Sequence, residues 1–356
     1  MLIPPTKYGT NTMLTRKVIP WNETLRGHGK GFGPGLGHAG RLAAFWGVLA
    51  ILSMMASIAH AAAPDKPKLG LLLYSRGFEF MVALDQGAQR EAKKLGVEMS
   101  VQDGQSDSQV QTNQVDDLLA QHVSAIIIAV ANSKEMVPAI RRANQANVPV
   151  VAVDSIIGEG AKFVTYVGFD NAAGAKMAAD YIVQNHKRKV LELQGALGAY
   201  HAQKRHQGFA EGLKASPDTK VIARPAEWQA SNAQTMTTDA LTADSDIDAI
   251  FSHNDEMIRG VVSALKQINK FKPVSDPSHI MIVGIDGTPL ALQRIRNGEQ
   301  DATVHQDPFE MGALAVRSAL DALQGKEVPA QQLLPPSLIT KENASDPQWW
   351  GNRFKP

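Results

Sequence analysis

Ala125-Ile-Ile-Ile-Ala-Val130 and Pro149-Val-Val-Ala-Val153 enclose a segment of helical length, residues 134–146, and this unit decides the fold class. Both apolar runs are short, uncharged and continuous, which is typical of strands buried on both faces of a sheet. A strand, a helix and a second strand in this order indicate two parallel strands joined by a crossover helix. Asp154 directly follows the second strand.

The same alternation extends along the chain in both directions. Residues 80–95 carry Met81, Leu84, Ala88 and Leu95 at helical spacing, and Gly96 ends the helix. Further strands are expected at residues 68–74, 97–102, 165–168, 189–193, 221–224, 249–252, 280–285 and 302–306, and further helices at residues 109–121, 172–185, 203–214, 232–241, 257–266, 289–297 and 309–323. Two successive sets of such units predict an α/β chain with two lobes, each built on a parallel sheet covered by helices.

The N-terminal 61 residues have the pattern of a leader. Residues 1–40 are rich in Gly, Pro and basic residues and show no apolar period. Arg41 then precedes an uncharged apolar run that ends in Ala59-His60-Ala61, which predicts a cleavable signal peptide cut near Ala61. The alternative is a membrane anchor, because the run is near the lower limit for spanning a bilayer. Met13 offers an alternative start codon.

The composition excludes several classes of protein. The 356 residues include 36 Lys and Arg against 35 Asp and Glu, so the strong basic bias of a nucleic-acid binder is missing. The absence of Cys excludes disulfides, thiolate metal sites and a Cys nucleophile. The part that follows the leader is long enough for two domains.

Polar residues follow most of the expected strands. In open parallel sheets, ligands bind beyond the carboxyl ends of the strands. The residues at those positions are Tyr74, Val130, Asp154, Gln194, Asn254, Asp286 and Gln306. Any one of the polar residues could instead cap the helix that follows it. Several of them on the same edge of a sheet favour a binding site.

Several motifs, in order along residues 68–340, resemble the sugar-binding proteins of ABC importers, most closely the ribose-binding type. They are Asp85-Gln-Gly-Ala-Gln-Arg-Glu-Ala-Lys-Lys-Leu-Gly96, Ala143-Asn-Gln-Ala-Asn-Val-Pro-Val150, Glu192-Leu-Gln-Gly195, Ala226-Glu-Trp228, Asn254-Asp-Glu-Met257, Val283-Gly-Ile-Asp-Gly-Thr-Pro289 and Ala302-Thr-Val-His-Gln306. In addition, Trp349-Trp-Gly-Asn352 resembles the C-terminal tail of other members of the superfamily.

This resemblance implies the type I periplasmic binding protein fold, in which two doubly wound, Rossmann-like parallel-sheet lobes are joined by a three-segment hinge. The crossings are expected near Gly168, Gln306 and Pro336. Residues 66–168 plus 307–336 would form the N-terminal lobe, and residues 169–306 plus 337–356 the C-terminal lobe.

The resemblance also implies the function. A monomer in the periplasm would bind a small sugar-like ligand between the lobes, close by hinge bending and dock on a membrane permease driven by an ATPase. An alternative is a sensor that presents the ligand to a chemoreceptor or a sensor kinase. Neither function needs a cofactor.

The second lobe carries most of the residues that match the family's ligand contacts. Arg205, Trp228, Asn254, Asp286 and Gln306 match, as does Asp154 in the first lobe. Carboxylates accept hydrogen bonds from sugar hydroxyls, Arg donates to them, and aromatic faces cover the apolar side of a sugar ring. Trp228 could instead pack between the lobes. Replacing Arg205 or Asp286 by Ala is expected to abolish binding and to leave the fold intact.

The first lobe departs from the family pattern. Phe80 keeps one aromatic wall, whereas Met81 replaces a second, and Ser155 replaces an Arg; Tyr74, Phe78 and Val130 stand where small polar contacts are usual. Packing at a helix start is an alternative role for Phe78 and Phe80. Replacement contacts could come from Arg76, Asn132 or Ser133. Because lost hydrogen bonds discriminate strongly, a short polyol, a deoxy-sugar or a furanose is expected in place of ribose.

Enzymes and transcription regulators fit poorly. After the first strand the chain reads Ser75-Arg-Gly-Phe-Glu-Phe80, which lacks the Gly-x-Gly-x-x-Gly of a nicotinamide-binding site. No Gly-x-Ser-x-Gly nucleophile elbow follows the leader. His201 and His206 have no companion acids in the pattern of a metal site and are expected to be exposed. A leader occupies the place of the DNA-binding headpiece of a lac-repressor-like regulator.

Overall fold

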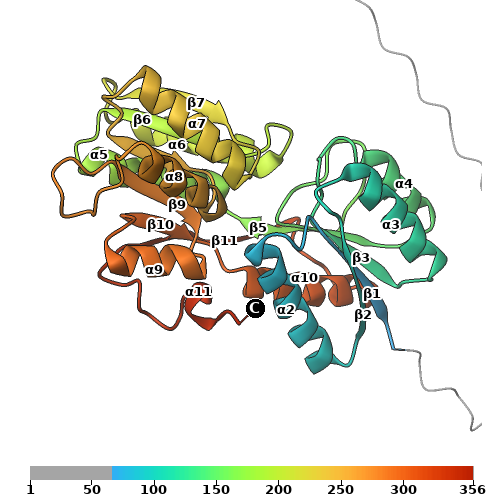
Figure 1. Cartoon of the computed structure of the whole chain (residues 1–356). Coiled ribbons are helices and arrows are strands. Elements are labelled where there is room, and N and C mark those ends of the chain that lie inside the picture. The colour runs from blue at the N-terminus through green and yellow to red at the C-terminus, as the bar shows by residue number, and fades with distance from the viewer. Residues whose placement is uncertain (1–65, 356) are drawn as a thin grey trace, which may run out of the picture. The chain divides into compact units, whose positions relative to one another are not determined.

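Two six-stranded sheets form the framework of the chain (Figure 1). The structure, a computed structural model, describes residues 66–355. The expected signal peptide, its cleavage site near Ala61 and the alternative start at Met13 lie outside the described residues. Each sheet with its helices is called a lobe below, the first lobe containing the sheet nearer the N-terminus.

The sheet of the first lobe has the order β11-β5-β4-β3-β1-β2, and all of its pairings are parallel. Its strands are β1 (Lys68–Leu73), β2 (Glu98–Asp103), β3 (Ala125–Ile128), β4 (Val150–Val153), β5 (Tyr166–Phe169) and β11 (Gln331–Leu334). The helices that pack on it are α2 (Glu79–Leu95), α3 (Ser108–Ala120), α4 (Val137–Gln145) and α10 (Pro308–Leu323).

The sheet of the second lobe has the order β12-β10-β9-β8-β6-β7. Its strands are β6 (Lys189–Gln194), β7 (Lys220–Pro225), β8 (Ala249–Ser252), β9 (Met281–Asp286), β10 (Ala302–His305) and β12 (Ser337–Ile339). Its helices are α5 (Asn171–Gln184), α6 (Tyr200–Leu213), α7 (Ala230–Ala243), α8 (Asp255–Gln267), α9 (Pro289–Asn297) and α11 (Trp350–Arg353). Strand β12 runs antiparallel to β10, and the apolar pattern predicted neither β11 nor β12.

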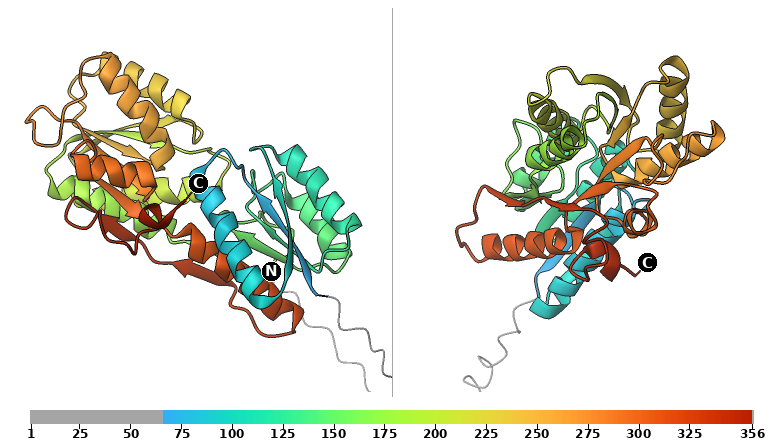
Figure 2. Two further views of the ribbon diagram at one scale, coloured as in Figure 1. Left: turned by 60° about the horizontal axis from the view of Figure 1, so that its bottom comes forward. Right: turned by 90° about the vertical axis from the view of Figure 1, so that its left-hand side faces the viewer.

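The three isoleucines of β3 show why the sheet is covered on both faces. Side chains along a strand alternate between its two faces. Ile127 packs in one cluster with α2 and α10, whereas Ile126 and Ile128 belong to a second cluster with α3 and α4. All three are fully buried, so this strand requires a helix layer on each side. Figure 2 shows α2 and α10 side by side along the first lobe.

The chain passes between the two sheets three times. It crosses from β5 to α5, from β10 to α10 and from β11 to β12. The first and third crossings are tied together, because the backbone N–H of Asp170 donates to the carbonyl of Leu334 over 3.1 Å. Asp307 lies in the second crossing and caps α10 by accepting from the N–H groups of Phe309 and Glu310.

No helix within residues 66–355 combines the length and the apolar character that crossing a bilayer requires.

Candidate ligand-binding site

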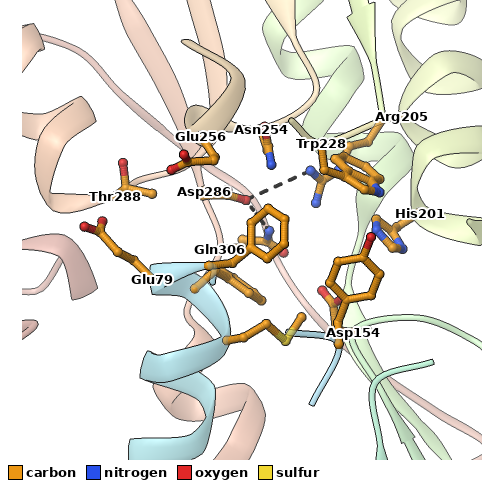
Figure 3. A pocket seen from close by; sticks show the side chains of 14 residues that line it. Glu79, Asp154, His201, Arg205, Trp228, Asn254, Glu256, Asp286, Thr288 and Gln306 are labelled. Carbon is orange, nitrogen blue, oxygen red and sulfur yellow. Dashed lines mark hydrogen bonds and ion pairs between the residues drawn. The ribbon is translucent and has the colours of Figure 1, made fainter. Parts of the chain in front are cut away.

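A cavity of about 590 Å³, part of it open to solvent, lies where the carboxyl ends of the strands of both lobes meet (Figure 3). The first lobe contributes the segment after β1, the start of α2 and the residue after β4; the second lobe contributes the rest. The lining residues are Tyr74, Phe78, Glu79, Phe80, Met81, Asp154, His201, Arg205, Trp228, Asn254, Glu256, Asp286, Thr288 and Gln306.

The residues expected at the site from the sequence line this cavity, except Val130, Gln194 and Ser155. Ser155 is 1% exposed, and its hydroxyl has no hydrogen-bond partner among the described residues. The neighbouring Asp154 has a φ of 61°, so the chain turns sharply at this point, and it is Asp154 that faces the cavity. The expectation that Ser155 lines the site is therefore not met.

The suggested replacement contacts also lie elsewhere. Arg76 pairs with Asp85 over 2.8 Å. Asn132 lines a separate groove, where its side-chain Oδ1 accepts from the backbone N–H of Lys134. Ser133 does not line the cavity, and Val130 is buried in the core of the first lobe. Of the first-lobe residues that differ from the family pattern, only Tyr74, Phe78 and Met81 line the cavity.

Sequence reasoning missed four lining residues: Glu79, His201, Glu256 and Thr288. Three of them follow the end of β1, β8 or β9 within a few residues, close to the start of the next helix. Extending the strand-end rule into the first helical turn would have found these three. His201 was expected to be exposed, and this was wrong, because the ring of Trp228 stacks on it.

Arg205 is the lining residue with the most complete set of interactions. Arg205 lies on α6, and the residue is 2% exposed. Nε donates to Oδ1 of Asn171 over 2.8 Å, and Nη1 donates to the carbonyl of His253. Nη1 also lies 4.0 Å from Oδ1 of Asp286. The guanidinium is therefore held by neutral acceptors and faces a carboxylate at the edge of ion-pair distance.

Burial lowers the pKa of Arg205, and the nearby carboxylates of Asp286 and Asp154 oppose that shift. Even so, an arginine side chain stays protonated in proteins. Arg205 therefore supplies a fixed positive charge and donors to the cavity.

Asp286 ends β9 and is held from two sides. Nε2 of Gln306 donates to Oδ1 over 2.6 Å, and the indole N–H of Trp350 donates to the backbone carbonyl over 2.7 Å. Burial raises the pKa of Asp286 to about 8; Arg205 opposes the shift, and the carboxylate of Asp255 adds to it. At 4.0 Å, the charge of Arg205 does not outweigh the rise in pKa that burial and Asp255 cause.

Asp154 is the acid contributed by the first lobe. Burial raises the pKa of its carboxyl to about 6, against the opposing charge of Arg205. Its backbone carbonyl accepts from the hydroxyl of Tyr166 over 2.9 Å. Within residues 66–355 the carboxylate oxygens accept no hydrogen bond, so they are available to a ligand's donors.

An aromatic wall closes one side of the cavity. The rings of Trp228 and His201 stack with centroids 4.7 Å apart and an interplanar angle of 19°, and the guanidinium of Arg205 lies 5.6 Å from the Trp228 ring centroid. Gly195 permits this packing, because a Cβ there would lie 2.0 Å from Cη2 and Cζ2 of Trp228. Burial lowers the pKa of His201 well below its usual value, so the imidazole is neutral.

Asn254 caps α8 and also faces the cavity. Its Oδ1 accepts from the backbone N–H of Met257 over 2.9 Å. That bond identifies the oxygen and leaves the Nδ2 donors for the cavity. The capping role considered from the sequence and a ligand contact are therefore compatible.

An ion-pair chain connects the lobes at the cavity. Nη2 of Arg259 in the second lobe lies 3.3 Å from Oε1 of Glu79 in the first, and its Nε lies 2.9 Å from Oε2 of Glu256. Both carboxylates belong to lining residues, and all three side chains are partly exposed. These ion pairs favour the arrangement in which the two lobes are closed over the cavity.

Within the described part of the chain, no group of three or more His, Asp or Glu side chains is placed to hold a metal ion.

Comparison with known proteins identifies the family. Residues 69–327 match the model of the periplasmic binding protein domain. The chain belongs to this family. Its fold and its resemblance to sugar-binding import proteins, both expected from the sequence, are thereby confirmed. The family consists of binding proteins, and this agrees with the expectation of binding without catalysis.

Individual relatives of this periplasmic binding protein extend the comparison. The ribose import binding protein of Escherichia coli K12 is 32% identical over 290 residues, 81% of this chain and 95% of that protein. The galactofuranose-binding protein of the same strain is 32% identical over 246 residues, 67% of this chain and 74% of that protein. The myo-inositol binding protein of Caulobacter, solved with myo-inositol, superposes with a TM-score of 0.74 at 28% identity and covers 81% of this chain and 98% of its own.

Proposed function

We propose that this chain is the periplasmic substrate-binding protein of an ABC importer. It captures a small, polyhydroxylated ligand between its lobes and delivers it to a membrane permease. The observation that carries the proposal is the cavity between the strand ends of both lobes, which the buried side chains of Asp154, Asp286 and Arg205 line together.

The chemistry of the lining supports a ligand that presents several hydroxyl groups. A hydroxyl both donates and accepts, so it can bond to the carboxylates as a donor and to Arg205 or Asn254 as an acceptor. Trp228 and Phe80 offer apolar faces for the C–H side of such a ligand. Two relatives are named for ribose and galactofuranose, and one similar structure holds myo-inositol. These three compounds all present several hydroxyl groups.

The first lobe argues against ribose as the preferred ligand. Tyr74, Phe78 and Met81 supply bulk there, and no second arginine lines the cavity within the described residues. A ligand that needs two arginine donors would lose hydrogen bonds in this site. A short polyol, a deoxy-sugar or a furanose fits this lining better.

Delivery follows from the arrangement of the lobes. Three chain crossings provide a hinge, and the pair between Glu79 and Arg259 spans the two lobes at the cavity. Ligand contacts from both lobes favour the closed form, which a permease can distinguish from the open one. The leader of residues 1–61, with its Ala59-His60-Ala61 ending, supports export to the periplasm.

A thermal-shift screen tests the ligand class. The protein is purified after export, and its melting temperature is measured with monosaccharides, furanosides and polyols at increasing concentrations. A ligand at a hundred times its dissociation constant stabilises the folded state by about 2.7 kcal/mol. At least one member of these classes should raise the melting temperature, and ribose should do so less than the best ligand. A complete panel without any shift would refute the proposed ligand class.

A further inference from the structure

Acidic side chains outnumber basic ones in the cavity. Four lining residues carry carboxylates, namely Glu79, Asp154, Glu256 and Asp286. Arg205 is the one lining residue of the described chain with a fixed positive charge, since the pKa of His201 is lowered well below its usual value and its imidazole is neutral. The site therefore holds more acid than its own bases balance.

Neighbouring arginines balance only the outer part of this charge. Arg259 pairs with Glu79 and with Glu256. Neither of the inner acids, Asp154 and Asp286, has a partner as close. Nη1 of Arg205 is 4.0 Å from Asp286, and the same guanidinium is already bonded to Asn171 and to the carbonyl of His253.

A third buried acid lies behind the inner pair. Asp255 is 3% exposed, and its carboxylate accepts from the backbone N–H groups of Gly287 and Thr288 and from the hydroxyl of Thr303. These donors are neutral, and the carboxyl of Asp255 adds to the rise in the pKa of Asp286 that burial causes. Acids that interact in this way disfavour each other's ionisation unless a cation joins them.

Gln306 gives an independent sign of what the site needs. Its Nε2 donates to Asp286 over 2.6 Å, which leaves the amide oxygen as an acceptor. That oxygen is buried without a hydrogen-bond partner among the described residues, and Gln306, a lining residue, is 2% exposed. A buried polar atom of this kind normally has a partner. A ligand that donates hydrogen bonds would satisfy it.

The balance of donors and acceptors distinguishes an amine from a hydroxyl. Asp154, Asp286 and Gln306 all present acceptors to the cavity. A hydroxyl brings one donor and two acceptor lone pairs, whereas a protonated amine brings donors only, together with a positive charge. An amine therefore satisfies more of these atoms, and its positive charge favours the ionised form of both acids.

We propose that the preferred ligand carries a protonated amine among its hydroxyl groups, as in an amino-polyol or an imino-sugar. This inference rests on the proposed function, since it refines the ligand of the same cavity. The ammonium group binds between Asp154 and Asp286 within reach of Gln306, and the hydroxyls face Arg205 and Asn254.

Matched pairs of compounds test the inference. Isothermal titration calorimetry at neutral pH compares glycerol with serinol, in which an amine replaces the central hydroxyl. It also compares anhydroribitol with its imino analogue, in which a protonated nitrogen replaces the ring oxygen. We expect the amine to bind about tenfold more tightly in at least one pair, because charge-assisted hydrogen bonds are roughly twice as strong as neutral ones.

Variants then locate the effect. Asp286→Asn and Asp154→Asn keep the size of the side chain and remove its ability to ionise, so each should reduce the ratio of amine affinity to hydroxyl affinity toward one. Glu327→Gln removes an exposed carboxylate outside the cavity and should leave the ratio unchanged. A ratio that persists in both Asp variants would overturn the inference.

The outcomes separate this inference from the proposed function. If the neutral compounds bind at least as tightly as the amines in both pairs, the amine is excluded and the polyhydroxylated ligand class stands. If neither member of either pair binds and the sugar and polyol screen is also negative, both proposals fail. Preferential binding of an amine supports both.

Discussion

Replacing Arg205 by Ala should damage the fold of the second lobe as well as the ligand site. The side chain donates to Oδ1 of Asn171 over 2.8 Å and to the backbone carbonyl of His253. Asn171 is 4% exposed and His253 is fully buried, so neither acceptor can turn to bulk water. The sequence-based expectation of an intact fold after this substitution therefore has to be revised.

The expected loss of stability can be worked from these two contacts. Each buried acceptor left without a donor costs about 1–3 kcal/mol, which gives roughly 2–6 kcal/mol for the two. Removing a buried guanidinium recovers part of its desolvation cost. We therefore expect the free energy of unfolding of Arg205→Ala to fall by about 3 kcal/mol.

Ligand affinity should fall independently of this loss. With Arg205 gone, Asp154 and Asp286 both lose the positive charge that opposes the rise in their pKa, and a ligand hydroxyl loses its charged donor. Truncating one partner of a buried charge pair costs about 2–5 kcal/mol, so affinity should fall at least about thirtyfold.

Equilibrium urea denaturation without ligand, followed by circular dichroism, measures the first effect, and calorimetry on the folded variant measures the second. Arg205→Lys keeps the charge but not the planar fork that reaches two acceptors, and it should retain part of the stability. Gln207→Ala, at an exposed position of the same helix, serves as the control. Unfolding of Arg205→Ala within about 0.5 kcal/mol of the wild type would refute the reasoning, because ordinary surface substitutions have effects of that size.

Three further substitutions probe the same site. Burial raises the pKa of Asp286 from 3.8 to about 8, so its ionisation destabilises the folded protein as pH rises through this range. In ligand-free melting curves, Asp286→Asn should therefore melt at a higher temperature than the wild type above about pH 8. The difference in melting temperature should shrink toward about pH 4. Gly195→Ala should weaken ligand binding measured by calorimetry, because the new Cβ would lie 2.0 Å from the Trp228 ring and displace it. Arg259→Gln should weaken affinity by only about two- to fivefold, and the difference from wild type should vanish at high salt, because its pair with Glu79 is partly exposed.

Each of these expectations has a result that contradicts it. A melting difference for Asp286→Asn that does not depend on pH would show that the carboxyl is not held protonated. Gly198→Ala is the matched control for Gly195→Ala, because its Cβ would meet only the side-chain amide of Asn132, at 3.0 Å. Equal affinities for the two glycine variants would remove the argument from Trp228. A salt-independent loss in Arg259→Gln would indicate a role other than the ion pair.

The order of strands and helices could be predicted because the signals behind it are local. The isoleucines of β3 indicate a strand buried on both faces, and Gly96 ends α2 with a φ of 71°. The strand-end rule then placed Asp154, Asn254 and Asp286 at one cavity, because parallel strands present their carboxyl ends at a common edge. Strands β11 and β12 escaped prediction, because they are short and only half-buried.

Which face a side chain takes is decided by the backbone at a single residue and by its neighbours in space. Asp154 and Ser155 are adjacent and both polar, and the φ of 61° at Asp154 and the packing around it place them differently. His201 is similar, since its helical position gave no sign that Trp228, from another segment, would stack on it.

The amino-acid sequence by itself thus determined two α/β lobes, the pattern of a leader and most of the residues of one polar cavity, since each of these depends on short-range periodicity or residue type. The tertiary structure alone decided the charge state of the site. The pKa of Asp286 depends on burial, on Arg205 from α6 and on Asp255 from α8, and the pair between Glu79 and Arg259 joins residues 180 positions apart. Electrostatic energy depends on distance and burial in three dimensions, and neither can be read from positions along a chain.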